Sequence, residues 1–471
     1  MVPISVLRKL RSGAILGAAH DMKRKIYNQL LEWKRKGAGK TALLVDGARR
    51  VGKSYIAEEF GRREYESFCI VDFSKPSKKI RELFELYLDD LDTFFFYLQQ
   101  RMNVRLVPGK SLVVFDEVQL YPAARAALKH LVADGRFHYL ETGSLVSLKR
   151  NVKNILIPSE ERHIQMHPMD FEEFLWALGN ETAVPLARDC FEKRRALGNA
   201  SHRQLMDLFR QYMVVGGMPQ AVAAFAEGRD VEEADRAKRD ILTLYRADIR
   251  KYAGRLVDKI ERTFDEIPSL LQRHERKVRL SALQEGARMK NWEDAFIWLR
   301  EAMTVNIAQN ATEPAVGLKS ALDRTSIKCY MADTGLLVSH TFDENALASG
   351  GIHRRLLCGD IDANEGMLAE NAVAQMLVAS GHKLFFYSRG SGDGSENRME
   401  VDFLLTRADV GRRKNIHAVE VKSGRNTKHV SLDKFRRKFA AAVGESYLLH
   451  AKDVSERDGI VYLPLYMGMF L

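Results

Sequence analysis

The chain has 471 residues, enough for two to four domains, and 46% of them are hydrophobic, so each domain can bury an ordinary core. Lys and Arg number 73 against 62 Asp and Glu, a formal net charge of +11 that permits nucleic-acid binding without requiring it. No run approaches the ~20 apolar residues of a membrane span. The first residues lack a signal-peptide pattern, and the scattered cysteines match neither a zinc site nor a disulfide framework. We therefore expect a cytoplasmic protein without a membrane segment.

Residues 1–36 are basic and end in MKRKIYNQLLEWKRKG, whose apolar spacing predicts an amphipathic helix. The next stretch, TALLVDGARRVGKS at residues 41–54, predicts a buried strand, a glycine-rich loop and the start of a helix. The loop matches G-x-x-x-x-G-K-[ST] at every fixed position and consists of Gly47, Ala48, Arg49, Arg50, Val51, Gly52, Lys53 and Ser54. Backbone N–H groups of such a loop bind phosphates, the lysine contacts the β- and γ-phosphates, and the hydroxyl binds Mg²⁺. The sequence thus predicts a site for ATP and Mg²⁺.

Two later strand ends carry side chains suited to the same site. The apolar run SLVVFDE ends in Asp116 and Glu117, the position at which P-loop ATPases hold Mg²⁺ and orient the attacking water. The segment FHYLETGSL predicts another strand, which ends near Thr142 and Ser144. Their hydroxyls either bind the γ-phosphate or the water, or simply form a turn with a helix cap.

The middle of the chain is charged and mostly helical. Residues 181–255 are interrupted by the sequence GGMP at 216–219. Residues 256–345 show three helical segments, IERTFDEIPSLLQRH, RLSALQEGA and NWEDAFIWLREA, followed by two expected strands, TVNIAQN and SIKCYMADTGLL. Three helices followed by a hairpin predict a winged helix that binds DNA. A helical connector used for protein contacts is the alternative, because no dense basic recognition helix is present.

Residues 346–471 predict a last α/β unit with a second group of charged side chains. The segment MLAENAVAQMLVAS predicts a helix that carries Glu370, and MEVDFL predicts a strand with Asp402 on its polar face. The strand HAVEVKSGR displays Glu420 and Lys422 on one face. Two carboxylates, a helper carboxylate and a lysine on neighbouring strands are typical of the metal site of PD-(D/E)xK nucleases. The alternative is a domain that keeps this fold and only binds nucleic acid or a partner.

Ten sequence blocks together resemble one family, the bacterial and archaeal AAA-type ATPases that carry a C-terminal domain of unknown function. The blocks are GARRVGKS, VVFDEVQ, TGSL, HPMDFEEFL, YMVVGGMPQAV, YRADIRKY, CYMADTGLL, LAENAVAQML, MEVDFLL and AVEVKSG, and the resemblance runs from about residue 22 to the end. It implies an α/β protein made of an N-terminal basic helix (1–36), a P-loop AAA-type ATPase core (37–180), a helical lid (181–255), a winged-helix-like module (256–345) and a restriction-endonuclease-like, PD-(D/E)xK domain (346–471).

The resemblance also implies an arginine that acts on the ATP of a neighbouring subunit, and therefore a homo-oligomer. Arg162 lies at the corresponding position, although the family's Leu-x-Gly-Arg step is replaced here by SEERHIQMHPMDF. Arg150 is the other candidate. Three functions follow: an ATPase motor that acts on DNA, including branched DNA; an ATP-gated, Mg²⁺-dependent nuclease; and a signalling ATPase that switches with its nucleotide and binds a protein partner.

Overall fold

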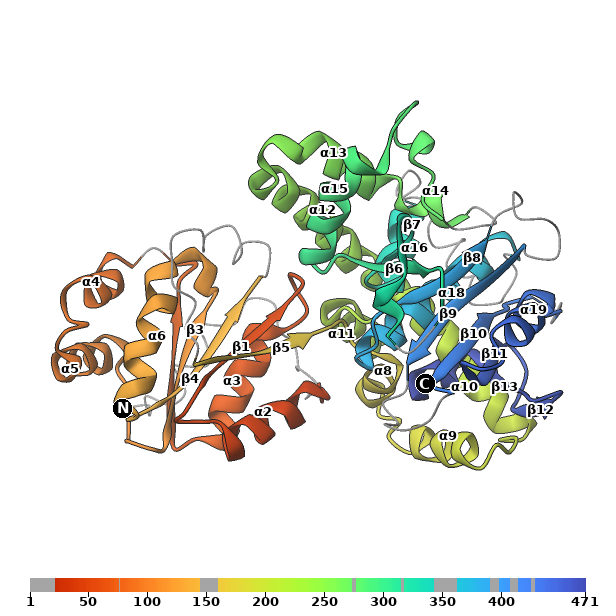
Figure 1. Cartoon of the computed structure of the whole chain (residues 1–471). Coiled ribbons are helices and arrows are strands. Elements are labelled where there is room, and N and C mark those ends of the chain that lie inside the picture. The colour runs from red at the N-terminus through yellow and green to blue at the C-terminus, as the bar shows by residue number, and fades with distance from the viewer. Residues whose placement is uncertain are drawn as a thin grey trace.

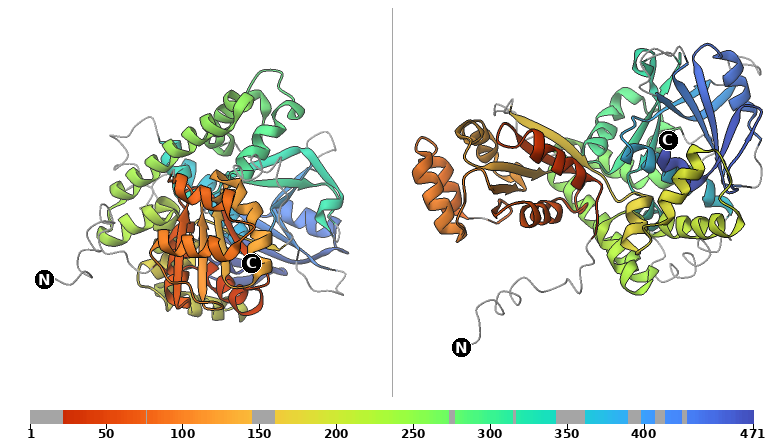
Figure 2. Two further views of the ribbon diagram at one scale, coloured as in Figure 1. Left: turned by 90° about the vertical axis from the view of Figure 1, so that its left-hand side faces the viewer. Right: turned by 90° about the horizontal axis from the view of Figure 1, so that it is seen from below.

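The computed structural model describes residues 22–75, 77–144, 160–272, 277–314, 317–342, 362–389, 398–406, 414–424 and 428–471. Figure 1 shows a first sheet with its helices as one body and a second sheet with its helices as another. Figure 1 and the right view of Figure 2 show the two bodies lying side by side, and strand β5 (Glu161–Met166) leads from the first body to helix α8 (Phe171–Ala177) of the second. None of the described helices is both long and apolar enough to cross a bilayer.

The first body is an α/β unit built on five parallel strands. Its elements are α2 (Ile26–Lys36), β1 (Ala42–Gly47), α3 (Lys53–Glu64), β2 (Ser67–Asp72), α4 (Lys78–Leu86), α5 (Leu91–Met102), β3 (Ser111–Asp116), the 3-10 helix η1 (Val118–Leu120), α6 (Pro122–Asp134), β4 (His138–Gly143) and β5 (Glu161–Met166). The strand order is β2-β3-β4-β1-β5, so one strand separates β1 from β3. The strand, loop and helix expected over residues 41–54 are confirmed as β1 and α3.

Helices cover both faces of this sheet because its strands are apolar on both sides. Leu43 and Val45 of β1 pack with Ile56 of α3 and with α2 on one face. Ala42 and Leu44 pack on the other face, against α4, α5 and α6. Such two-sided burial is what a parallel sheet requires, and it explains the continuous apolar runs in β1 and β3.

The second body contains the remaining helices and an eight-stranded mixed sheet. Its helices are α8 (Phe171–Ala177), α9 (Ala183–Glu192), α10 (Asn199–Val215), α11 (Pro219–Gly228), α12 (Val231–Tyr252), α13 (Val257–Asp265), α14 (Ile267–Gln272), α15 (Met289–Glu301), α16 (Thr334–Thr341), α18 (Asp362–Ala379) and α19 (Val430–Lys438). Its strands are β6 (Val305–Ala311), β7 (Leu322–Met331), β8 (Phe385–Arg389), β9 (Met399–Thr406), β10 (Ile416–Val421), β11 (Val443–His450), β12 (Ser455–Arg457) and β13 (Ile460–Pro464). Short 3-10 helices are η3 (Gly254–Leu256), η4 (Leu280–Ala282), η5 (Leu318–Ser320) and η8 (Leu465–Phe470). The strand order is β12-β13-β11-β10-β9-β8-β6-β7, with α18 on one face and α19 on the other.

The hairpin expected as the wing of a separate module has a different position. Strands β6 and β7 pair with each other, but β6 also pairs with β8, so both belong to the eight-stranded sheet. The strand expected over residues 326–337 ends at Met331, where Asp333 caps α16 instead. The helix expected over RLSALQEGA contains only the 3-10 turn η4. The boundary expected between residues 345 and 346 therefore does not separate two sheets.

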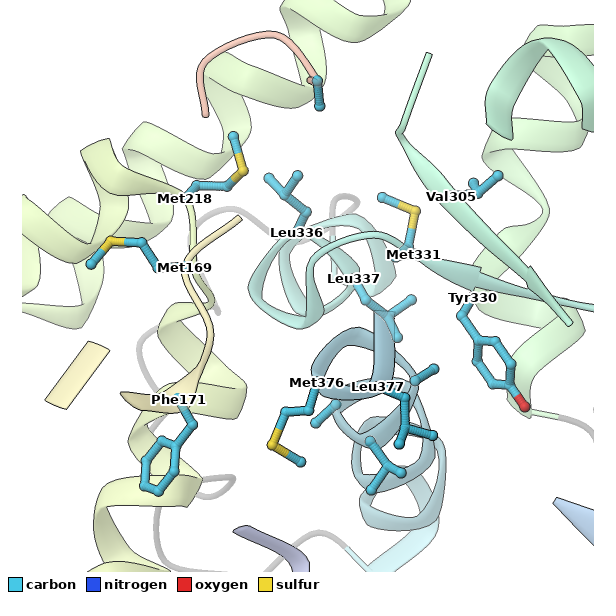
Figure 3. Packing of buried hydrophobic residues seen from close by; sticks show 14 of the residues in the cluster. Met169, Phe171, Met218, Val305, Tyr330, Met331, Leu336, Leu337, Met376 and Leu377 are labelled. Atoms are coloured by element: carbon cyan, nitrogen blue, oxygen red, sulfur yellow. The ribbon is translucent and has the colours of Figure 1, made fainter. Parts of the chain in front are cut away.

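Three distant segments meet backbone to backbone beside the start of α16. The Met169 N–H donates to the Gly217 carbonyl at 2.7 Å, and a Cβ on Gly217 would lie 1.9 Å from the Met169 carbonyl oxygen. The buried Asp333 accepts hydrogen bonds from the N–H of Gly217 at 2.5 Å and of Leu336 at 2.9 Å. Figure 3 shows the apolar side chains around this contact, including Met218 and Leu336. The GGMP and ADTGLL sequences therefore have a packing role in joining α8, α11 and α16.

Candidate active site

The loop between β1 and α3 forms an anion-binding turn at the N-terminal end of α3. Gly52 has φ +98°, a left-handed conformation that suits glycine, and α3 begins at the next residue, Lys53. A Cβ on Gly47 would lie 2.5 Å from the carbonyl oxygen of Met166, so only glycine fits there. The free N–H groups and the dipole of α3 face this turn and favour a bound phosphate.

The Lys53 side chain lies inside the loop. Its Nζ donates to the carbonyl oxygens of Gly47 at 3.1 Å and Ala48 at 3.0 Å. Burial lowers the pKa of Lys53, while the negative charges of Glu117 and Asp116 oppose that shift. The loop thus holds the ammonium group at the place where the negative charge of a phosphate would stabilise it.

The ends of β3 and β4 meet beside Ser54. Asp116 Oδ1 accepts a hydrogen bond from Ser54 Oγ at 2.8 Å and another from the Thr142 hydroxyl. The same Thr142 Oγ1 accepts from the Glu117 N–H at 3.1 Å. Thr142 is fully buried, so its hydroxyl connects the two acidic residues to the neighbouring strand. A hydroxyl and a carboxylate are oxygen donors of the kind Mg²⁺ prefers, so these residues fit that ion.

Glu117 has a left-handed backbone, φ +55°, which is uncommon outside glycine. Its side chain accepts a hydrogen bond from Gln119 Nε2, and Gln119 Oε1 accepts from the Ser144 N–H at 3.4 Å. All three residues line the pocket described next. Sequence analysis did not identify Gln119, although its position two residues after the acidic pair places it in the same turn.

A pocket of about 920 Å³ opens in front of the loop, which is within the size range of sites for small ligands. Its walls come from both bodies. The first body contributes Met22, Arg24, Arg49, Arg50, Gly52, Lys53, Ser54, Asp116, Glu117, Gln119 and Ser144, and the second contributes Pro219, Gln220, Tyr245, Asp248, Lys251, Trp298 and Thr304. The side chains of Ala48 and Val51 are buried, so these two loop residues can contribute only backbone atoms.

Helix α12 contacts the phosphate loop directly. Arg49 forms an ion pair with Asp248 at 2.5 Å, and the Tyr245 hydroxyl donates to the Arg49 carbonyl oxygen at 3.2 Å. On the other side of the loop, Arg24 donates to the Val51 carbonyl oxygen at 2.9 Å. Sequence analysis missed these contacts because the partners lie far apart along the chain, and a motif does not indicate which distant residue its side chains contact.

The predicted trans-acting arginine does not line this pocket. Arg162 is an exposed residue of β5, the edge strand next to β1, and its positive charge lowers the pKa of Glu32 only after the larger effect of Lys36. The other candidate, Arg150, lies outside the described residues.

The four residues predicted as a second metal site do come together in the second body. Asp402 Oδ2 accepts from the Val421 N–H at 2.9 Å, and Glu420 Oε1 pairs with Lys422 Nζ at 2.7 Å. Burial raises the pKa of Glu420 to about 7, together with the nearby Asp402 charge. Glu370 on α18 is fully buried. Within the described part of the chain, no three or more His, Cys, Asp or Glu side chains are arranged to hold a metal ion.

A lysine that sequence analysis did not consider lies among these carboxylates. Lys328 of β7 is fully buried, with Nζ 3.1 Å from Glu370 Oε1 and 3.2 Å from Asp402 Oδ1. Burial alone lowers the pKa of Lys328, but the Tyr330 hydroxyl and the surrounding carboxylates outweigh that effect and raise it above its usual value.

Comparison with protein families identifies the parts of the chain. The AAA domain family matches residues 39–175, and two domains of unknown function match residues 206–346 (DUF8612) and 365–467 (DUF4143). No curated protein sequence matches the chain.

Among solved structures, the chain is similar to PCH-2 of C. elegans, at 13% identity and TM-score 0.26, covering 45% of this chain and 65% of that one. It is also similar to Cdc6p from Pyrobaculum aerophilum, at 12% identity and TM-score 0.25, covering 73% and 97% of the two chains. A third is Drosophila ORC bound to DNA, at 12% identity and TM-score 0.27, covering 68% and 94%. TM-scores this low do not establish a common fold, so the assignment rests on the family matches and on the α/β core described above.

Proposed function

We propose that this chain, which is an AAA-type P-loop protein with a C-terminal domain of unknown function, binds Mg²⁺–ATP at residues 47–54 and hydrolyses it. The observation that carries the proposal is the joint geometry of Ser54, Asp116 and Glu117 beside the lysine-bearing loop. When bound, Mg²⁺ neutralises charge on the β- and γ-phosphates.

Each residue of the site has a distinct role in this proposal. The N–H groups of the loop and Lys53 bind the phosphates, and Ser54 and Asp116 supply oxygen ligands to the metal ion. Glu117 orients the attacking water and accepts its proton, with Gln119 holding the carboxylate. Thr142 acts as a positioning residue, because its hydroxyl contacts Asp116 and the Glu117 backbone.

The arginine that completes the site comes from a second copy of the chain. Arg162 supports this proposal because it is exposed on an edge strand and is absent from the walls of its own pocket. A mixing experiment tests it: Arg162→Ala keeps an intact pocket, and Lys53→Ala keeps the arginine. If the finger acts in trans, equal mixing of the two inactive variants restores part of the ATPase activity, and no recovery in mixed oligomers would contradict the proposal.

The nucleotide state is passed to the second body through α12. One end of this helix contacts the loop through Asp248, and near the other end Asp235 accepts a hydrogen bond from Ser339 of α16 at 2.5 Å. A shift of the loop upon hydrolysis would therefore move α12 against α16. This link supports an ATPase whose energy is used in the C-terminal half rather than a free-standing hydrolase.

DNA, including branched DNA, is the proposed substrate, and the net charge of +11 supports it. The test is steady-state ATP hydrolysis with and without linear duplex and four-way-junction DNA at low and moderate salt, with Lys53→Ala as the background control. We expect DNA to stimulate hydrolysis and the stimulation to fall as salt rises, because phosphate contacts release counterions. Hydrolysis that no DNA alters would contradict the DNA proposal and favour the nucleotide switch that binds a protein partner.

A further inference from the structure

The centre of the C-terminal acidic cluster is occupied by a side chain. Lys328 Nζ lies 2.8 Å from Glu400 Oε1, in addition to its contacts with Glu370 and Asp402, and 5.3 Å from the centre of the Phe386 ring. The side chain of Lys328 is 1% exposed, so the protein rather than water surrounds its charge. An ammonium group that contacts three carboxylates in a buried site is a fixed internal counter-ion.

Several of the carboxylate oxygens that a metal ion would need are engaged by protein donors, whereas the buried Glu420 Oε2 accepts no hydrogen bond from the described residues. The Tyr330 hydroxyl donates to Glu370 Oε1 at 2.5 Å, the oxygen that Lys328 also contacts. One oxygen of Asp402 contacts Lys328 and the other accepts a backbone N–H. Glu420 Oε1 pairs with Lys422. In the conformation that the structure describes, a divalent ion at this cluster would have to displace the Lys328 ammonium group from Glu370 and Asp402.

We infer that the Lys328 ammonium group takes the place of the divalent cation in this nuclease-like arrangement. The C-terminal domain then binds no Mg²⁺ or Mn²⁺ at this cluster and does not cleave phosphodiester bonds. The ion pairs of Lys328 with Glu370 and Asp402 instead link β7 to α18 and β9. A divalent ion would have to displace a tethered cation whose effective concentration at the site is far higher than that of a free ion. The inference is independent of ATP hydrolysis, because the cluster does not line the nucleotide pocket.

Mn²⁺ binding to the full-length protein without nucleotide, followed by electron paramagnetic resonance, tests the inference. We expect the wild type and Asp402→Asn to bind Mn²⁺ equally, because the cluster holds none. We expect Lys328→Met, which keeps the length of the side chain and removes its charge, to gain one Mn²⁺ per chain, and Lys328→Met/Asp402→Asn to lose it. A folded Lys328→Met protein that gains no Mn²⁺ would overturn the inference.

Two further measurements keep the test decisive. Lys238→Met removes another fully buried lysine, which lies 3.6 Å from Asp235 on α12, and should gain no Mn²⁺. If Lys328→Met does not fold, the comparison of the wild type with Asp402→Asn decides. A Mn²⁺ ion that the wild type binds and Asp402→Asn does not bind would contradict the inference. Plasmid nicking by the wild type with Mg²⁺ or Mn²⁺, abolished by Lys422→Ala, would contradict it equally.

Discussion

Two buried lysines among the described residues, Lys53 and Lys328, lie near carboxylates, but their side chains contact different groups. Lys53 contacts carbonyl oxygens of its own loop, so Asp116 remains paired with a hydroxyl at the edge of a pocket of about 920 Å³. Lys328 contacts the carboxylates themselves, and its side chain is only 1% exposed. The same residue types thus form an open ligand site in one body and a closed ion-pair cluster in the other. The atoms that each lysine contacts decide which of the two results.

The largest expected effect separates these two lysines. Lys53→Ala removes the charge that the phosphates need, and we expect the rate of ATP hydrolysis to fall by at least ~10³-fold, comparable to the loss of a key electrostatic group in other enzymes. Lys328→Met should leave the rate within about twofold, because the two sites are distant and share no partners. Phosphate release at saturating ATP measures both rates. An active Lys53→Ala protein would refute the P-loop assignment.

The second effect compares two glutamates. Glu117→Gln keeps the shape of the side chain but cannot accept a proton, so we expect kcat to fall by ~10²–10⁴-fold with ATP binding retained. The matched variant, Glu420→Gln, should leave kcat unchanged. Phosphate release and binding of a fluorescent ATP analogue distinguish the two properties. Loss of nucleotide binding in Glu117→Gln would show that the residue has another role.

The third effect is a pH dependence of the free energy of unfolding that comes from Asp46, the residue of β1 directly before the phosphate loop. Burial raises the pKa of Asp46 to about 6, against the opposing charges of His163 and Lys53. Below about pH 3 the carboxyl is protonated in both folded and unfolded chains. As pH rises from about 4 to 6 the unfolded chain loses this proton first, so the contribution of Asp46 to the free energy of unfolding falls.

Asp46→Asn removes this dependence, so its stability relative to the wild type should rise across that pH window by up to ~3 kcal/mol and then level off. Urea denaturation at pH 4, 5, 6 and 7 measures the difference. Asp207→Asn, at an exposed partner of Arg210, is the control and should show no such trend. A difference that is flat or falls with pH would contradict the expected shift.

The smallest effect concerns the positioning hydroxyl. Thr142→Val removes the hydrogen bonds to Asp116 and to the Glu117 N–H, and we expect kcat to fall by roughly 10-fold, the equivalent of about 1.4 kcal/mol. The KM for ATP should change little, and Thr142→Ser should restore most of the rate. A raised KM with unchanged kcat would instead indicate that the Thr142 hydroxyl contacts the nucleotide.

Most of the first body could be predicted from the sequence because its signals are local. The loop motif, the strand before it and the acidic pair at the end of β3 each depend on neighbouring residues, and the AAA domain match confirms the core. The roles assigned to Thr142 and Ser144 stay predictions. The wall that α12 contributes could not be predicted, because Arg49 and Asp248 are 199 residues apart and an ion pair leaves no pattern in a single sequence.

The sequence by itself predicted the phosphate-loop motif, the alternation at the start of β9 and the grouping of Asp402 with Glu420, whereas every residue of β10 is buried. Only the tertiary structure decided that β6 and β7 join the C-terminal sheet and that Lys328 lies among the predicted metal ligands. The alternation of a strand can be predicted because it depends only on consecutive residues. The partner of a buried charge cannot, because it depends on how the eight-stranded sheet and α18 bring β7 and β9 together.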